Sequence, residues 1–311
     1  MNDSLQFILL VSGDRQHLQA EIRKPFGVFH VAVVLMLAFT VSACTTAQDL
    51  APAPSALTSY TSSTKYAAIV VDGTDGKVLY QTASDDVRHP ASLTKMMTLY
   101  LLFEAMESGR VSATTQIPVS DRARVQAPTK IGFRRGGTID VDSAIKALVT
   151  KSANDVAVAI AEYLGGTEDN FAAIMTAKAR AIGMRSTVFR NASGLPDPGQ
   201  VTTARDMALL GLALRKRFPQ YYYYFSTQSF AFNGRMIRGH NDLLADVDGV
   251  DGIKTGYIRA SGYNIVTSVS RGNRKLVAVV MGGDSARARN AEVTQLIERY
   301  MPENIVTSLA F

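Results

Sequence analysis

The chain has 311 residues, of which 47% are hydrophobic, 19% are charged and one is cysteine. This length can bury a substantial core in one large domain or two modest ones, and so few Cys and His residues exclude a zinc finger, an iron–sulfur site and a disulfide framework. The net charge of +6 favours an anionic polymer or surface over nucleic acid as a partner.

The N-terminal region is typical of an export signal. Residues 26–43 form an uncharged apolar run, and Arg23 and Lys24 stand just before it. Basic residues before an apolar stretch keep that side in the cytoplasm, so the residues that follow are expected to reach the periplasm or cell envelope. We therefore interpret residues 1–43 as a signal peptide.

Cys44 directly follows this run, in the sequence Val-Ser-Ala-Cys. The pattern resembles the bacterial lipoprotein signal, in which the cysteine carries the lipid, and it predicts a membrane anchor at Cys44. Ordinary cleavage after Ala43 and an uncleaved apolar anchor are the alternatives, and all three imply export. Residues 44–64 are small, polar and proline-containing, which indicates a tether.

Residues 65–305 are predicted to form one domain of the α/β (α+β) class. A hairpin is expected over 65–81, followed by helices over 96–106, 143–164 and 171–182 and a helix capped by Thr202 or Thr203. Strand patterns return at 228–232, 262–270 and 275–281, before a closing helix over 284–299. Strands near both ends predict one antiparallel sheet built from both chain ends, packed with helices, beside a helical lobe. A site is expected where lobe and sheet meet.

Three Ser-x-x-Lys patterns could each bring a nucleophilic hydroxyl near a lysine: Ser62–Lys65, Ser92–Lys95 and Ser143–Lys146. Ser62 lies in the tether, and Ser143 lies at a predicted helix start with Lys146 toward solvent. Ser92 follows a proline, which suits the first turn of a helix, so Lys95 should lie one turn further on the same face. There an amine can take the hydroxyl proton and the helix N-terminus favours an oxyanion, although a serine that merely caps the helix is the alternative.

Two further strings complete a set. Ser152-Ala153-Asn154 lies in the predicted helical stretch, and Lys254-Thr255-Gly256 precedes the late strands. Ser-x-x-Lys, Ser-x-Asn and Lys-Thr-Gly in this order are similar to the motifs of penicillin-binding proteins and class A β-lactamases.

With these motifs the sequence resembles the low-molecular-weight penicillin-binding proteins that act as serine D-alanyl-D-alanine carboxypeptidases. The likeness runs from about Tyr66 to Tyr300 and includes HPASLTKMMT (89–98), NASGLPDPG (191–199), VDGIKTG (250–256) and VMGGDSARAR (280–289). The resemblance implies a β-lactamase/transpeptidase-like fold, peptidoglycan stem peptides ending in D-Ala-D-Ala as substrates and β-lactam antibiotics as inhibitors. It implies no cofactor and no metal.

The resemblance also implies roles for the motif residues. Ser92 is expected to form an acyl-enzyme and release D-Ala, with a neutral Lys95 as its base. Burial and the charge of Lys254 would have to lower the pKa of Lys95 from about 10.4 to about 7. Ser152 would relay a proton between Lys254 and the leaving amine, and Asn154 would hold Lys95 and the amide of the substrate.

Binding roles follow in the same way. Lys254 and Thr255 would face a carboxylate, Gly256 would let backbone approach, and the N–H groups of Ser92 and Tyr257 would form an oxyanion hole. Arg289 would bind the terminal carboxylate, for which a surface arginine at a helix start is the alternative. Asn241 is expected to contact substrate.

The sequence departs from the family in three places. Gly239-His240-Asn241 has Gly and His where many relatives have Asn and another middle residue, and Tyr257 stands where relatives often have His. Larger members carry a C-terminal β-rich domain, which we do not expect because the chain ends 55 residues after Gly256.

Other functions stay open. A D,D-endopeptidase would use the same residues, whereas a class A β-lactamase would need a Glu-x-x-x-Asn string that is missing after Asn154. A non-catalytic β-lactam-sensing module is a further alternative. Tyr221–Tyr224 is expected to pack in the core rather than stack on carbohydrate, and His89 has no Asp partner for a His-based triad.

Overall fold

The structure is a computed structural model that describes residues 64–302. The signal peptide, Cys44, Ser62 and nearly all of the tether lie outside the described residues. Within the described part, every helix is too short or too polar to cross a bilayer.

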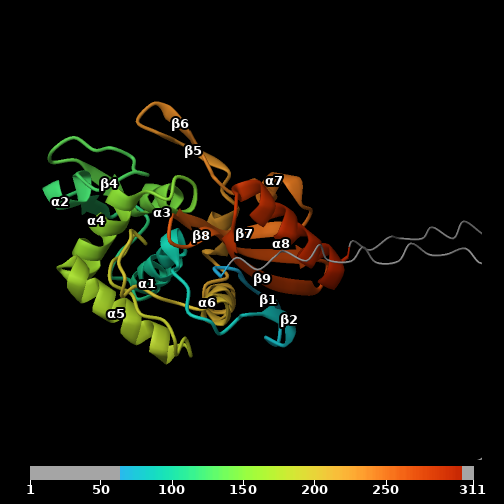
Figure 1. The fold of residues 1–311 in the computed structure, drawn as a ribbon. Coiled ribbons are helices and arrows are strands. Elements are labelled where there is room, and N and C mark those ends of the chain that lie inside the picture. The colour runs from blue at the N-terminus through green and yellow to red at the C-terminus, as the bar shows by residue number, and fades with distance from the viewer. Residues whose placement is uncertain (1–63, 303–311) are drawn as a thin grey trace, which may run out of the picture. The chain divides into compact units, whose positions relative to one another are not determined.

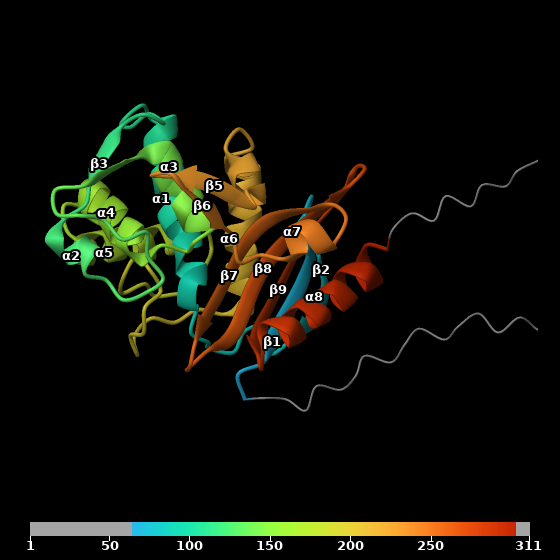
Figure 2. The ribbon, with the colours of Figure 1, turned by 90° about the horizontal axis from the view of Figure 1, so that it is seen from above.

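Five antiparallel strands form the central sheet, in the order β2-β1-β9-β8-β7 (Figures 1 and 2). They are β1 (Ala67–Asp72), β2 (Val78–Thr82), β7 (Val250–Ile258), β8 (Gly262–Arg271) and β9 (Arg274–Gly283). The early strand β1 pairs with the late strand β9, with Ala68 opposite Val280. The prediction of one antiparallel sheet that gathers both ends of the domain is therefore confirmed.

The strands β1, β8 and β9 are buried on both faces over most of their length, which explains why β1 and β9 read as continuous apolar runs. Successive side chains of a strand point to opposite faces. Ile69 and Val279 belong to the core toward the helical lobe, whereas Val70 and Val280 belong to the core under α8 (Ala286–Tyr300). Figure 2 shows α8 and α6 (Ala204–Arg217) on opposite sides of the sheet.

The helical lobe is built around α1, which is buried on nearly all sides and apolar around most of its circumference (Figure 1). Its elements are the 3-10 turn η1 (Ala91–Thr94), α1 (Lys95–Glu107), α2 (Asp121–Arg124), α3 (Val141–Val149), α4 (Asn154–Gly165) and α5 (Glu168–Ala181). Because α1 follows η1 without interruption, the packing of α1 also fixes the position of Ser92.

The predicted helix over 143–164 is wrong as a single element. The helix α3 ends at Val149 and α4 begins at Asn154, and Ser152 between them has a φ of +58°. This left-handed conformation cannot continue a helix. Apolar spacing did not reveal the break because Thr150 and Ala153 are also buried, so the pattern of burial runs through it.

The strand β7 was not predicted, because Lys254 and two glycines interrupt its apolar pattern. The remaining short elements are β3 (Gln116–Pro118), β4 (Thr138–Asp140), the 3-10 turn η2 (Tyr222–Ser226), β5 (Ser229–Phe232), β6 (Arg235–Arg238) and α7 (Leu243–Asp246). Thr203 caps α6 by accepting a hydrogen bond from the backbone N–H of Asp206, as expected. Tyr222 and Tyr224 pack in the core, and Tyr223 is exposed.

Candidate active site

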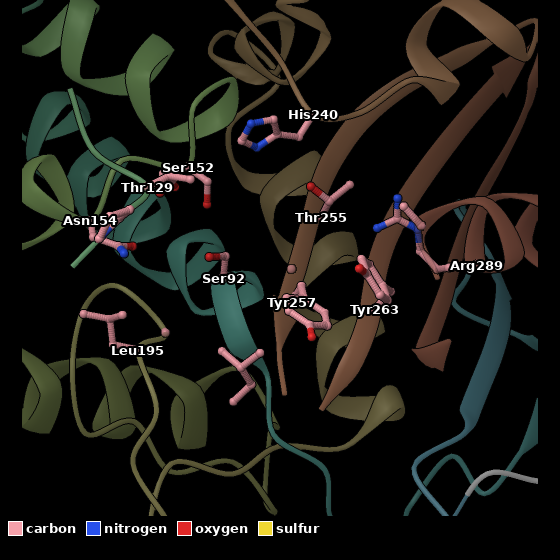
Figure 3. Close-up of a pocket in the computed structure, with 15 residues that line it drawn as sticks. Ser92, Thr129, Ser152, Asn154, Leu195, His240, Thr255, Tyr257, Tyr263 and Arg289 are labelled. Atoms are coloured by element: carbon pink, nitrogen blue, oxygen red, sulfur yellow. Dashed lines mark hydrogen bonds between the residues drawn. The ribbon is translucent and has the colours of Figure 1, made fainter. Parts of the chain in front are cut away.

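A cavity of about 370 Å³ opens between the helical lobe and the sheet (Figure 3). The sequence-predicted site residues that line it come from η1, the α3–α4 turn, α4, β7 and α8; they are Ser92, Ser152, Asn154, Thr255, Gly256, Tyr257 and Arg289. Lys95 and Lys254 lie behind this lining and are almost completely buried. Three motifs that are distant in sequence therefore meet around one opening.

Two glycines clamp η1, the turn that carries Ser92. A Cβ atom on Gly256 of β7 would lie 3.0 Å from the backbone nitrogen of Ser92, and one on Gly194 would lie 1.9 Å from the carbonyl oxygen of Ala91. Only glycine permits such approaches. Ala91 itself has a φ of +49°, a strained conformation for a residue with a side chain. The turn is therefore held between β7 and the segment 191–199.

The Nζ atom of Lys95 is surrounded by three oxygen atoms. It lies 3.2 Å from Oγ of Ser92 and 2.7 Å from Oδ1 of Asn154, and it also donates to the carbonyl oxygen of Ser193. The expected pairing of Lys95 with Ser92, one helical turn apart, and its contact with Asn154 are thus both present. The contact with Ser193 was not anticipated from the sequence.

The pKa of Lys95 lies well below its usual range. Complete burial is the main cause, and repulsion from Lys254 adds to it, while the carboxylate of Asp155 acts in the opposite direction. Asp155 is itself buried and accepts hydrogen bonds from the backbone N–H groups of Ile131 and Gly132. Burial and the neighbouring lysine therefore both favour the neutral amine.

Lys254 lies on the edge strand β7, and its Nζ donates to the carbonyl oxygen of Thr255 at 2.8 Å. Burial, followed by repulsion from Arg289, lowers the pKa of Lys254 to about 7. This lysine can thus gain or lose a proton near neutral pH.

Ser152 and Asn154 differ in how their polar atoms are used. The Oγ atom of Ser152 is buried and has no hydrogen-bond partner among the described residues. In contrast, Asn154 donates from Nδ2 to the carbonyl oxygen of Ala127 at 2.9 Å, while its Oδ1 accepts from Lys95. The hydroxyl of Ser152 therefore has unused hydrogen-bonding capacity beside the cavity, whereas the amide of Asn154 positions Lys95.

Arg289 is not a surface residue, because only 3% of it is exposed. It lies in the first turn of α8, and its Nη1 donates to the carbonyl oxygen of Asn264 at 2.8 Å. Burial lowers its pKa to about 10, which still leaves a full positive charge at neutral pH. A fixed cation held in this way is suited to bind a carboxylate.

Several residues that line the cavity around Ser92 were not predicted from the sequence. They are Pro128, Thr129, Gly194, Leu195, His240, Ile258, Tyr263 and Ala286. The rings of Tyr263 and Tyr257 are in contact, with centroids 4.3 Å apart and planes tilted by 32°, and Tyr257 remains 52% exposed at the opening. The unusual Gly-His-Asn segment was the only available signal for His240.

The other sequence candidates lie elsewhere. Asn241 lines an adjacent cavity of about 350 Å³ and not the one around Ser92. Lys146 pairs with Asp142 at 2.6 Å on α3, with no part in the cavity. His89 contacts the carbonyl oxygen of Gln200.

Comparison with known proteins was consistent with this arrangement. A family model described as D-alanyl-D-alanine carboxypeptidase matches residues 54–285. The D-alanyl-D-alanine carboxypeptidase DacA of Escherichia coli K12 is 36% identical over 236 residues, which are 74% of this chain and 59% of that protein. DacF of Bacillus subtilis is 32% identical over 236 residues, which are 74% of this chain and 60% of that protein. The chain thus spans about three fifths of the length of these curated relatives.

Solved structures also match. The carboxypeptidase DacD of Francisella tularensis has a TM-score of 0.73 and 29% identity, with 75% of this chain and 69% of that chain covered. Penicillin-binding protein D2 of Listeria monocytogenes, in a cefotaxime-bound form, has a TM-score of 0.68 and 30% identity, with 75% and 95% covered. The predicted fold class is thereby confirmed.

Proposed function

The chain belongs to the D-alanyl-D-alanine carboxypeptidase family, and on this premise we propose that it removes the terminal D-Ala from peptidoglycan stem pentapeptides through an acyl-enzyme on Ser92. The observation that carries the proposal is the contact between Nζ of Lys95 and Oγ of Ser92, made at the mouth of a cavity between lobe and sheet.

The surroundings of Lys95 suit a base that starts neutral. A neutral amine has two N–H groups and one lone pair. Asn154 and Ser193 each offer an oxygen that accepts one N–H, so the lone pair is left for the hydroxyl proton of Ser92. Ser92 can then attack the carbonyl carbon of the penultimate D-Ala while its proton passes to Lys95.

The negative charge that develops on the carbonyl oxygen needs donors already in place. We assign this role to the backbone N–H groups of Ser92 and Tyr257. The close approach of β7 to η1 at Gly256 supports the assignment, since it brings the two backbone segments together. Donors of this kind typically contribute about 100- to 1,000-fold in rate each.

Collapse of the tetrahedral intermediate breaks the peptide bond, and the leaving amine of D-Ala needs a proton. We assign the relay to Ser152, which lines the cavity and whose hydroxyl has no hydrogen-bond partner among the described residues. Lys254 can supply it, since its pKa of about 7 allows both protonation states near neutral pH. Water then attacks the ester carbonyl and gives a proton to Lys254 through Ser152. The oxygen of Ser92 leaves and takes back its proton from Lys95, which releases the tetrapeptide acid and regenerates the enzyme.

The terminal carboxylate of the substrate is proposed to bind beside the two buried cations of the site. Arg289 and Lys254 are both buried cations beside Thr255, whose side chain lines the cavity. Both donate to neutral oxygens, and neither forms an ion pair with a described residue. Burying a cation without an anionic partner is costly, so an anionic ligand end is the natural complement of this region. A β-lactam, which carries a carboxylate and a reactive carbonyl, is proposed to acylate Ser92 in the same way; the cefotaxime-bound Listeria relative supports this.

Product analysis tests the function. Incubation with a stem pentapeptide should release free D-Ala and leave a tetrapeptide, and no other fragment. Cleavage of a cross-linked dimer in place of D-Ala release would indicate an endopeptidase. Rapid turnover of penicillin would indicate a β-lactamase, and penicillin binding with no product from either peptide would indicate a sensor.

We further propose that the protein acts outside the cytoplasm, anchored by a lipid on Cys44. The apolar run over 26–43 and the Cys that follows it support this location, because stem peptides are assembled into the cell wall on the outer side of the membrane.

A further inference from the structure

His240 lines the cavity although it belongs to none of the three motifs. Figure 3 shows its imidazole at one end of the opening, between Ser152 on the helical side and Thr255 on the sheet side. Its neighbours Gly239 and Asn241 border the adjacent cavity instead. The segment between β6 and α7 thus separates the two cavities, and His240 is its residue that lines the cavity around Ser92.

Charged groups from several elements act on this imidazole. Burial is the main cause that lowers the pKa of His240, and Lys254 of β7 and Lys151 of the α3–α4 turn lower it further. Asp242, from the same segment as His240, opposes them. The other titratable groups around the cavity are Lys95, Tyr257, Tyr263 and Arg289. His240 therefore stands in an excess of positive charge, with its neutral form favoured while the cavity is empty.

We propose that His240 is a specificity-determining residue, which in its protonated form helps to recognise the terminal carboxylate of the substrate. The proposal rests on the proposed function, because that reaction brings a carboxylate into the cavity. A carboxylate bound beside Thr255 and Arg289 would offset the repulsion from the neighbouring lysines. The proton on His240 would then become more stable than it is in the free enzyme.

The direction of the pH effect follows from this linkage. If the anion raises the pKa of His240, binding takes up a proton. The gain in affinity is fully present below the pKa of His240 in the free enzyme, and it is lost as the pH rises through the pKa in the complex. Since burial and the lysines hold the free value below the ordinary value of about 6.5, the gain appears in mildly acidic solution.

The test compares kcat/KM for D-Ala release from a pentapeptide between pH 5 and pH 8.5, in the wild type and in His240→Asn. The titrations of Lys95 and Lys254 affect both enzymes and largely cancel in the ratio of the two values. We expect a ratio near one above pH 8 that rises to about tenfold at pH 5, mainly through KM, as for one unit of pKa change. His240→Lys, which keeps a fixed charge, should retain the gain at high pH.

A ratio that stays constant over this range, or a His240→Lys variant no better than His240→Asn at pH 8, would overturn the proposal. His89→Asn is the matched control: its side chain contacts Gln200 away from the cavity, and its ratio should be independent of pH. Thermal melting checks that each variant folds. If His240→Asn does not fold, His240→Gln takes its place as the uncharged variant. If the wild type releases no D-Ala at all, the proposed function fails; if it does and the ratio is flat, only the role of His240 fails.

Discussion

Gly194 lies so close to Ala91 that a Cβ atom on it would stand 1.9 Å from the Ala91 carbonyl oxygen. This contact presses the segment 191–199 against the turn that carries Ser92. It also holds the carbonyl group of Ser193 against the Nζ atom of Lys95. The geometry of the lysine therefore depends on a residue without any functional group.

Gly194→Ala should accordingly damage both stability and catalysis. The new methyl group cannot fit, and the φ of +86° at this position is also unfavourable for alanine. We expect a loss of at least about 3 kcal/mol in the free energy of unfolding and slower acylation by penicillin, measured by denaturant titration and by labelling kinetics. Gly109→Ala is the control, since φ is +73° there but open space surrounds it, and about 1 kcal/mol is expected. Equal losses for both variants would contradict the packing argument.

Ser92→Ala should abolish labelling by a fluorescent penicillin, because Ser92 carries the one hydroxyl among residues 64–302 that is hydrogen-bonded to Lys95. Ser143→Ala serves as the comparison: it removes the serine of a second Ser-x-x-Lys pattern, whose Lys146 pairs with Asp142 away from the cavity. Its labelling should match the wild type. Mass spectrometry of the adduct locates the modified peptide, and a penicillin attached anywhere but residue 92 contradicts the assignment.

Lys254→Met should stabilise the protein and remove most of its activity. A buried lysine with a pKa of about 7 in the folded state binds fewer protons than the unfolded chain between roughly pH 7 and 10.4. Stability is therefore greatest above that window and declines as the pH falls through it. Methionine does not titrate and so lacks this pH dependence. We therefore expect the variant to exceed the wild type in free energy of unfolding by about 2–4 kcal/mol at pH 6, with a difference that shrinks toward pH 10.

Urea titrations at pH 6 and pH 9.5 measure this gain, and D-Ala release measures the accompanying loss of function. A gain of equal size at both pH values would show that the burial of charge is not its cause.

Arg289→Gln should raise KM for the pentapeptide by about 10- to 100-fold and change kcat less, because a charge-assisted contact with the carboxylate contributes about 1.5–3 kcal/mol. Arg287→Gln is a matched control two residues earlier on the same helix, where the side chain is exposed. Michaelis–Menten measurements on both variants show whether KM rises only when Arg289 is replaced. Similar KM values for the two would remove Arg289 from the binding site.

Cys44→Ala should abolish metabolic labelling by palmitate and release the protein from the membrane fraction. The lone cysteine of the chain stands where a lipoprotein signal would place it, so no other residue can carry the thioether-linked lipid. Labelling followed by fractionation measures both effects. Retention in the membrane without palmitate would instead point to an uncleaved apolar anchor.

The sequence predicted the chemistry of the site better than its shape. Ser92 and Lys95 could be paired because one helical turn separates them, and that spacing fixes their distance whatever the rest of the chain does. Lys254 could be linked to them only by resemblance, because a strand on the far side of the cavity carries it. No local rule connects residues so distant in sequence.

The turn at Ser152 illustrates why other features escaped prediction. Its left-handed backbone interrupts a stretch in which buried residues continue on both sides, so the hydrophobic pattern shows no break. Likewise, Asn241 lines a different cavity from the one that its neighbour His240 lines. Which of two adjacent residues enters a cavity depends on the path of the backbone, and no periodicity encoded it here.

The pairing of β1 with β9 has a consequence for how this domain is made. As the chain emerges from its N-terminal end, β1 can pair with β2 at once, but its other edge stays open until about two hundred further residues have followed. An open edge with apolar faces is a site for wrong association, and closing so long a loop is slow. Nascent chains that end between Tyr257 and Arg274 should therefore be prone to aggregate, even though they already contain Ser92, Lys95, Ser152 and Lys254.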